Sequence, residues 1–161
     1  MADIPSSTAV VEPPRGMYPA RLDDKGRLKL PAEFQRYLAG LPEKKLFVTS
    51  TDRHMATVYP IAIWRENENL FATNRENPKV SKRVWFTSQE LGSEAEMDAQ
   101  GRVQFSPELR RELRIENQPV KVLIVHGAIQ VMGEETFHAQ RADASQSPEE
   151  DVEILQRAGF K

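Results

Sequence analysis

Two periodicities of hydrophobic positions run through the chain and predict an α+β protein that is rich in β-structure. Short apolar runs, such as residues 46–48 and 122–125, have the length and composition of strands. Apolar residues at helical spacing predict a helix over residues 60–74, and Asn77-Pro78 then interrupts the pattern. A second helix is expected over residues 77–90.

One segment of the chain occurs twice. Residues 22–38 and 97–113 align without a gap at an offset of 75, with six identities in 17 positions. The identical pairs are Asp23/Asp98, Gly26/Gly101, Arg27/Arg102, Glu33/Glu108, Arg36/Arg111 and Leu38/Leu113. A strictly repeated unit indicates a tandem, pseudo-twofold architecture. Neither copy has enough apolar residues for a core of its own, so the two halves are expected to share one sheet system.

The match continues more loosely beyond this segment. Residues 46–48 are expected to correspond to residues 123–125, and residues 56–59 to residues 129–132, while Trp64 falls where Phe137 falls. Each unit is therefore predicted to contain a strand, a D-x-x-G-R turn, a second strand, a proline-led helix, two further strands and a short helix.

The repeated motif has the composition of a tight turn. Asp23 and Asp98 can accept hydrogen bonds from backbone amides two residues on, and Gly26 and Gly101 supply a positive φ. The aspartates can also pair with the arginines four residues later, so a structural role is expected for both. Ser106 precedes a proline and can cap the second proline-led helix, whereas the first such helix has a weaker cap.

Composition changes this picture only locally. The chain has 161 residues, a net charge of −2 and no cysteine, which excludes disulfides and thiolate sites and argues against nucleic-acid binding through bulk charge. Residues 15–36, however, hold six basic residues against three acidic ones. The basic residues are Arg15, Arg21, Lys25, Arg27, Lys29 and Arg36. A phosphate-facing surface and a merely solvated face explain this cluster about equally well.

Two further groups of cations have alternative explanations. A second basic cluster contains Arg75, Lys79, Lys82 and Arg83, together with Glu76. It is best explained as a solvated helix face, with contact to a partner subunit as a further possibility. Arg110, Arg111 and Arg114 can approach phosphates, although pairing with Glu108 and Glu112 explains them as readily.

Catalysis, metal binding and a small-molecule substrate are not expected. Asp23 and Asp98 are related by the repeat, but a charged turn is an unusual setting for a carboxylate dyad. Three scattered histidines form no metal-ligand spacing, and no phosphate-binding glycine loop or nucleophile elbow occurs. No cofactor is expected.

The ends of the chain differ in composition from the repeats. We expect a flexible extension over residues 1–14, repeats over 15–76 and 91–141 joined by the basic helix 77–90, and an acidic tail over 142–161. Poor order is expected over residues 142–151, and Val152 to Phe160 form either a short terminal helix or a frayed end. Without a secretory signal or an apolar run of membrane-spanning length, a cytoplasmic protein is expected.

The two D-x-x-G-R motifs, with Tyr59-Pro60, Trp64 and Asn77-Pro78 in order between them, resemble the MraZ family over residues 15–138. These are bacterial transcriptional regulators of the division and cell wall gene cluster, related to AbrB-like swapped-hairpin DNA binders. The resemblance implies a swapped-hairpin barrel, a ring-shaped homo-oligomer and binding of double-stranded promoter DNA at G-rich direct repeats. A nucleoid-associated repressor is therefore expected, and the alternative is a non-catalytic ring-forming adaptor.

Carried over to this sequence, the family's DNA-binding loops correspond to Lys25, Arg27 and Arg102. The neighbouring cations Arg15, Lys29 and Arg36 extend this candidate site. Gln100 stands where the first loop has Lys25, so Arg102 is expected to contribute less to DNA affinity than Arg27.

Overall fold

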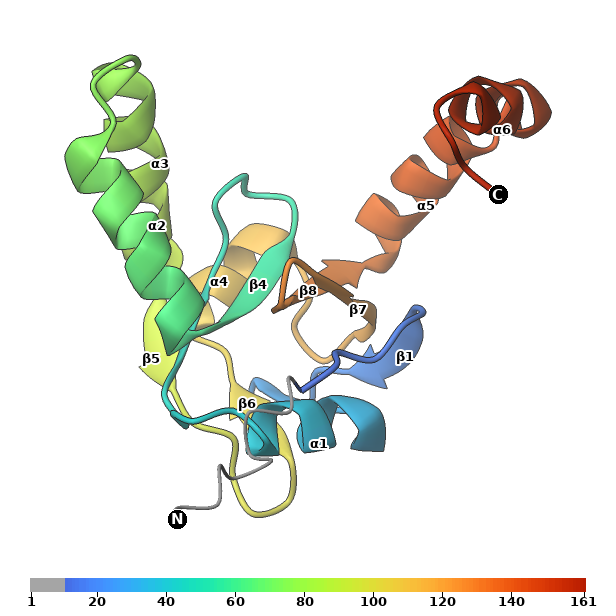
Figure 1. Ribbon diagram of the computed structural model, residues 1–161. Helices are drawn as coiled ribbons and strands as arrows, with labels where there is room; N and C mark the ends of the chain where they lie inside the picture. Colours follow the sequence, from blue (N-terminus) through green and yellow to red (C-terminus); the bar gives the residue numbers. More distant parts are fainter. Residues whose placement is uncertain (1–10) are drawn as a thin grey trace, which may run out of the picture.

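The computed structural model describes residues 11–161 and shows antiparallel strands with short helices beside them and two helical arms that project away (Figure 1). One six-stranded sheet has the order β1-β7-β8-β4-β3-β5, and β2 and β6 form a separate two-stranded ribbon. The strands are β1 (Tyr18–Arg21), β2 (Arg27–Lys29), β3 (Leu46–Thr49), β4 (Ala56–Pro60), β5 (Ser93–Ala95), β6 (Arg102–Gln104), β7 (Pro119–Val125) and β8 (Ala128–Gly133). The predicted α+β class is confirmed.

The helices follow the predicted order of elements. They are α1 (Ala32–Ala39), α2 (Ile61–Thr73), α3 (Pro78–Leu91), α4 (Pro107–Leu113), α5 (Glu134–Ala144) and α6 (Pro148–Arg157). Helix α4 begins as predicted, because the Ser106 side chain accepts a hydrogen bond from the Leu109 amide. Helix α1 begins after Pro31 without such a cap.

Strand pairing gives the two halves a pseudo-twofold relation. In the ribbon, Leu28 pairs with Val103, its own equivalent at the offset of 75. In the large sheet, Thr57 pairs with Gln130, which is its equivalent at an offset of 73. Each pair joins two equivalent residues, so the pseudo-twofold axis passes through both the ribbon and the middle of the sheet.

The expected match between residues 46–48 and 123–125 is wrong by three residues. Strand β1 pairs with β7 through Ala20 and Val120, and the equivalent strand β5 pairs with β3 through Ala95 and Leu46. Residues 46–48 therefore correspond to residues 120–122. Apolar character alone cannot fix the register within a continuous β-prone run, whereas the neighbouring strand does.

The correct register explains a polar residue within β7. Lys121 occupies the position of Phe47, and its Nζ lies 5.3 Å from the centre of the Phe137 ring. In the first half the Phe47 and Trp64 rings lie 4.6 Å apart. Trp64 and Phe137 thus occupy corresponding places, as their spacing predicts, although their partners differ.

A single core joins both repeats. Leu22, Leu28 and Phe34 of the first repeat belong to the same buried cluster as Val103 and Phe105 of the second. All five side chains are completely buried. The first D-x-x-G-R unit therefore buries its apolar face against the second.

The pseudo-symmetry ends at the periphery, where two helical arms leave the sheet on the side away from β6 (Figure 1). Helix α3 turns back from α2, and its Ser88 carbonyl accepts a hydrogen bond of 2.7 Å from the Thr49 hydroxyl. Helix α6 follows α5 and buries none of its residues. The expectation of poor order over residues 142–151 is wrong, because α5 reaches Ala144 and α6 begins at Pro148.

The ends of the chain add two observations. Residues 1–10 of the expected flexible extension lie outside the described residues. Within residues 11–161, no helix is both long enough and apolar enough to cross a membrane.

We expect residues 1–76, produced alone, to show no cooperative unfolding as a monomer, because Leu28 and Leu22 lose the apolar surface that the second repeat supplies. Mixing this fragment with residues 77–161 should restore the circular dichroism and the cooperative melting of the intact chain. A cooperatively melting monomer of residues 1–76 would contradict the shared core.

Candidate nucleic-acid interface

The first D-x-x-G-R loop is organised by one carboxylate. Oδ1 of Asp23 accepts hydrogen bonds of 2.9 Å from the backbone amides of Lys25 and Arg27. Its Oδ2 accepts a further bond of 2.9 Å from Nε of Arg27. Gly26 closes the turn with φ +79° and donates its amide to the Asp23 carbonyl at 3.1 Å. The loop thereby fixes the base of the Arg27 side chain.

The second loop repeats this geometry bond for bond. Asp98 accepts from the amides of Gln100 and Arg102 at 2.9 Å, and from Nε of Arg102 at 2.8 Å. Gly101 has φ +77°. The two arginines are therefore held in the same way, and each is about a quarter exposed.

Each loop is completed by the other repeat. The amide of Phe105 donates to the Gly26 carbonyl at 2.8 Å, and the amide of Leu30 donates to the Gly101 carbonyl at 2.9 Å. Two side chains cross the ribbon in the same sense: Gln104 donates to the Lys25 carbonyl at 2.8 Å, and Lys29 donates to the Gln100 carbonyl. Each of these bonds maps onto its counterpart at the offset of 75.

Helix residues from the opposite repeat cover the two loop glycines. A Cβ atom at Gly26 would lie 2.4 Å from the Arg110 guanidinium carbon, and one at Gly101 would lie 2.2 Å from the Gln35 amide carbon. Arg110 and Gln35 are also equivalent at the offset of 75. The sequence does not distinguish Arg110 from Arg111 and Arg114, because its place over Gly26 depends on packing between the repeats.

The ribbon separates apolar from charged residues. Leu28 and Val103 point into the core and are fully buried. The alternate positions therefore face outward, because successive strand side chains point to opposite sides. We call this outer surface, together with the adjoining loop lysine, the ribbon face. It consists of Lys25, Arg27, Lys29, Arg102 and Gln104.

The structure brings four of the six candidate DNA-binding residues into the ribbon face. Lys25 and Arg27 lie at one end, and Arg102 lies at the other, opposite Lys29. Lys29 thus adds a cation to the loop that has Gln100 in place of lysine. Arg110 adds one to the first loop, which also has Asp24 where the second loop has Ala99, so the net charge at the two ends is the same.

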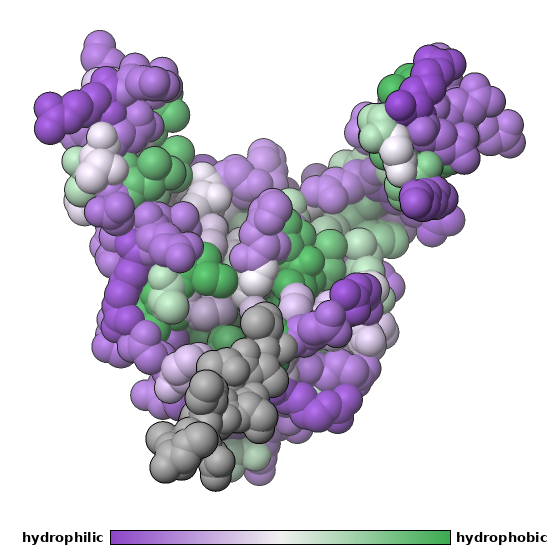
Figure 2. All heavy atoms as spheres, in the orientation of Figure 1, coloured by the Kyte–Doolittle hydropathy of each residue, from purple (hydrophilic) through white to green (hydrophobic). Residues whose placement is uncertain are grey.

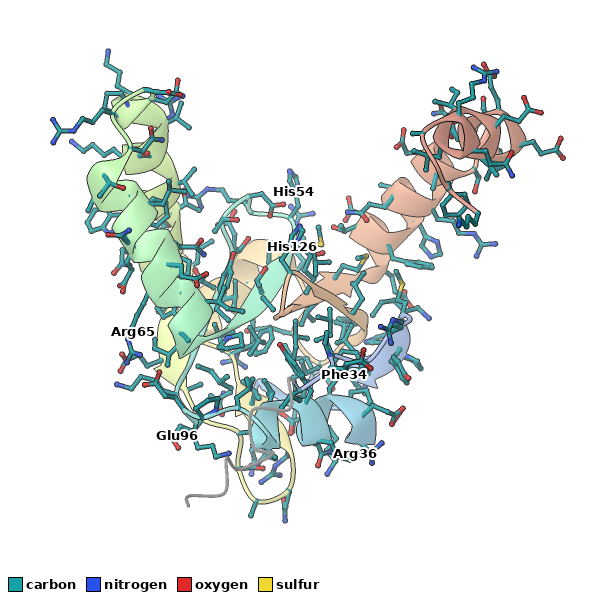
Figure 3. All side chains as sticks on the ribbon, viewed as in Figure 1. Phe34, Arg36, His54, Arg65, Glu96 and His126 are labelled. Carbon is teal, nitrogen blue, oxygen red and sulfur yellow. The ribbon has the colours of Figure 1, made fainter. Side chains whose placement is uncertain are left out.

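Arg15 and Arg36 lie outside the ribbon face. Arg15 precedes β1, at the end of that strand away from the first loop, and lies 3.5 Å from Glu12. Arg36 is exposed on the outer side of α1 (Figure 3), one residue after Gln35, which covers the second loop. Proximity in sequence to the first loop therefore brings neither arginine into the ribbon face.

The geometry does not assemble a catalytic dyad. Asp23 and Asp98 lie at opposite ends of the ribbon, and each is engaged by its own loop. Among residues 11–161, no three histidine or carboxylate side chains are grouped so as to hold a metal ion.

The hydrogen bonds lower the pKa of both loop aspartates below the ordinary value of 3.8. For Asp23 the main cause is the hydrogen bond from the Arg27 amide. The Arg27 side chain and the Lys25 amide lower this pKa further, whereas desolvation of the carboxylate opposes them. For Asp98 the corresponding donors are Arg102 and the Gln100 amide. A lowered carboxyl pKa means that the ionised form stabilises the folded chain.

This stabilisation is present above the ordinary pKa and is lost as the pH falls through the lowered values. The double variant Asp23→Asn/Asp98→Asn should therefore be less stable than the wild type near neutral pH. The difference in free energy of unfolding should shrink between about pH 5 and about pH 2, where the wild-type carboxylates become protonated. Urea unfolding at several pH values measures this, and a difference that is independent of pH would contradict it.

Comparison with known proteins supports the resemblance found in the sequence. No family model matches the chain. Three curated relatives are each named "Transcriptional regulator MraZ". The one from Acidobacterium capsulatum is 33% identical over 146 residues, which cover 91% of this chain and 99% of the relative. Those from Koribacter versatilis and Mycolicibacterium gilvum are 35% and 37% identical over 65% and 71% of this chain, and over 71% and 74% of their own length. On this similarity, the chain belongs to the MraZ family.

Proposed function

We propose that this protein is a sequence-specific DNA-binding transcriptional regulator without catalytic activity, and that the ribbon face contacts the DNA. Membership of a family whose relatives are named transcriptional regulators supports the regulatory role. The observation that carries the DNA-binding proposal is the outward placement of Lys25, Arg27, Lys29 and Arg102 on one two-stranded ribbon.

The shape of the ribbon suits the major groove of B-form DNA, which admits a two-stranded antiparallel ribbon. An arginine presented there can bind O6 and N7 of guanine with two hydrogen bonds. Asp23 and Asp98 occupy Nε of the two arginines, which leaves the terminal Nη groups for the base. The structural pairing and the recognition of DNA therefore support each other, because a fixed side chain loses less conformational freedom on binding.

The remaining cations would act on the DNA backbone. Lys25 and Lys29 are exposed beside the two arginines, and their ammonium groups can neutralise phosphates. Arg36 extends the positive surface along α1, and Arg15 would contact phosphate only if the DNA continued along β1. This assignment predicts specificity from Arg27 and Arg102 and general affinity from the lysines.

The wider arrangement follows the family resemblance. We propose that residues 15–76 and 91–141 form one AbrB-like swapped-hairpin barrel, with residues 77–90 as the connecting helix and 142–161 as an acidic, variable tail. Copies would assemble into a ring that engages G-rich direct repeats in the promoter of the division and cell wall gene cluster, acting as a cytoplasmic, nucleoid-associated repressor. A ring presents several ribbon faces, so modest contacts add up through avidity.

Substitution of the loop arginines tests the proposal. Arg27→Ala should weaken binding to DNA from upstream of the protein's own gene by about 1–3 kcal/mol per guanine contact, which is about 5- to 150-fold. Arg102→Ala should have a smaller effect, because its own loop has Gln100 where the first loop has Lys25. Fluorescence anisotropy titrations of both variants, with melting curves to establish folding, measure these changes.

Two controls make the result specific. Lys25→Ala should weaken binding to promoter and to scrambled DNA alike and reduce the slope of log affinity against log salt by about one. Arg65→Ala, on α2 and paired with Glu43 at 2.6 Å, removes an equal charge away from the ribbon and should leave binding unchanged. If folded Arg27→Ala bound promoter DNA like the wild type, the ribbon face would not be the reader and the adaptor function would gain support.

A further inference from the structure

The helical arm formed by α5 and α6 ends in apolar side chains that the described part of the chain leaves uncovered. Val152, Leu155 and Phe160 are 40%, 54% and 56% exposed, and Ile154 is similarly exposed. Figure 2 shows hydrophobic atoms at the surface of both arms. A solvated single helix gains little from exposing such residues, so this surface suits an interaction with another protein.

Helix α6 is nonetheless a well-defined element. It starts at Pro148 and has three acidic residues in its first turn, where negative charge interacts favourably with the positive end of the helix dipole. It ends in a Schellman motif: Gly159 has φ +114°, its amide donates to Gln156, and the Phe160 amide donates to the Leu155 carbonyl at 3.0 Å. This ending directs Phe160 toward Leu155, which shares a helix face with Val152.

The other arm carries a matching surface on α3. Trp85 and Phe86 are 45% and 59% exposed. Lys79, Lys82 and Arg83 precede Phe86 by seven, four and three residues, so these cations lie on its N-terminal side on the helix surface. Trp85 also lines a groove with Phe71 and Pro78 between α2 and α3. The surface thus combines apolar contact area with a basic rim.

The two surfaces are opposite in charge. Helix α6 carries Glu149, Glu150, Asp151 and Glu153. Glu149 and Asp151 precede Val152 and Leu155 by three and four residues, so they border the apolar face. The acidic rim on α6 is therefore complementary in charge to the basic rim on α3, and Val152 and Leu155 can pack against Trp85 and Phe86.

These surfaces cannot meet within one copy, because the two arms leave the sheet in different directions (Figure 1). We propose that α6 of one copy packs on α3 of a second copy. Within the proposed ring this contact runs head-to-tail, and closure of the ring leaves no copy with a free α6 or α3 surface. The inference rests on the ring assembly within the proposed function and identifies the surfaces that build it.

DNA is a less suitable occupant of α3. A phosphate backbone would use the cations of α3 but would leave Trp85 and Phe86 beside charged oxygens, whereas α6 covers both. The proposal therefore assigns Lys79, Lys82 and Arg83 to contact between subunits rather than to DNA, and it separates them from the ribbon face.

Charge reversal in the full-length chain tests the contact. Lys82→Glu/Arg83→Glu makes α3 acidic, and Glu149→Lys/Asp151→Lys makes the border of α6 basic. Each double variant should shift the assembly toward the 18.3 kDa monomer in sedimentation velocity at micromolar concentration. An equimolar mixture of the two variants should reassemble, because each variant's α3 then complements the other's α6.

A matched control separates this contact from a general effect of charge. Glu150→Lys/Glu153→Lys changes the same net charge on the other side of α6 and should leave assembly intact, with circular dichroism confirming the helix content of all variants. Unchanged assembly of both test variants, or failure of the mixture to reassemble, would overturn the α6–α3 contact.

The remaining outcomes distinguish this inference from the proposed function. A wild-type chain that stays monomeric would overturn both the contact and the proposed ring. Normal assembly of Lys82→Glu/Arg83→Glu with loss of DNA binding would overturn the contact and assign α3 to DNA. Normal assembly of both charge-reversal variants, together with the weakened DNA binding expected of Arg27→Ala, would overturn the contact but not the proposed function.

Discussion

The exchange of hydrogen bonds between the two loops and the opposite strands is the interaction on which this structure depends. Gly26 and Gly101 each offer a carbonyl to the first residue beyond the partner strand of the ribbon, Phe105 or Leu30. Buried backbone groups need such partners, since an unsatisfied one costs as much as a lost hydrogen bond. Neither loop can therefore adopt its observed form without the other repeat.

This constraint also sets the arrangement of charge. The short antiparallel ribbon buries Leu28 and Val103 and turns the residues on either side outward. The same Asp-to-Arg contact that closes each turn orients its arginine, so stability and presentation of the cations have one cause. Two equivalent loops then lie at opposite ends of one surface, which is how a protein of net charge −2 acquires a locally basic face.

Much of this arrangement could be predicted from the sequence, because its determinants are local. The glycines, the loop aspartates and Ser106 act within a few residues of their own positions, so the repeat was sufficient to place the turns and the cap. The register of β7 depends instead on pairing with β1, and the positions of Arg110 and Gln35 depend on packing between repeats. A short terminal helix was one of two alternatives for residues 152–160, but its start at Pro148 was not predicted, since the polar first turn of α6 resembles a disordered tail.

Native-state hydrogen exchange at Leu30 and Phe105 tests the central claim most directly, because their amides form the bonds that join the two repeats. If the repeats complete each other, both amides should exchange only through global unfolding, with the same free energy as the amides of the central strands β4 and β8. Exchange of either amide through a local opening of much lower free energy would show that one loop stands without the other and would contradict the account.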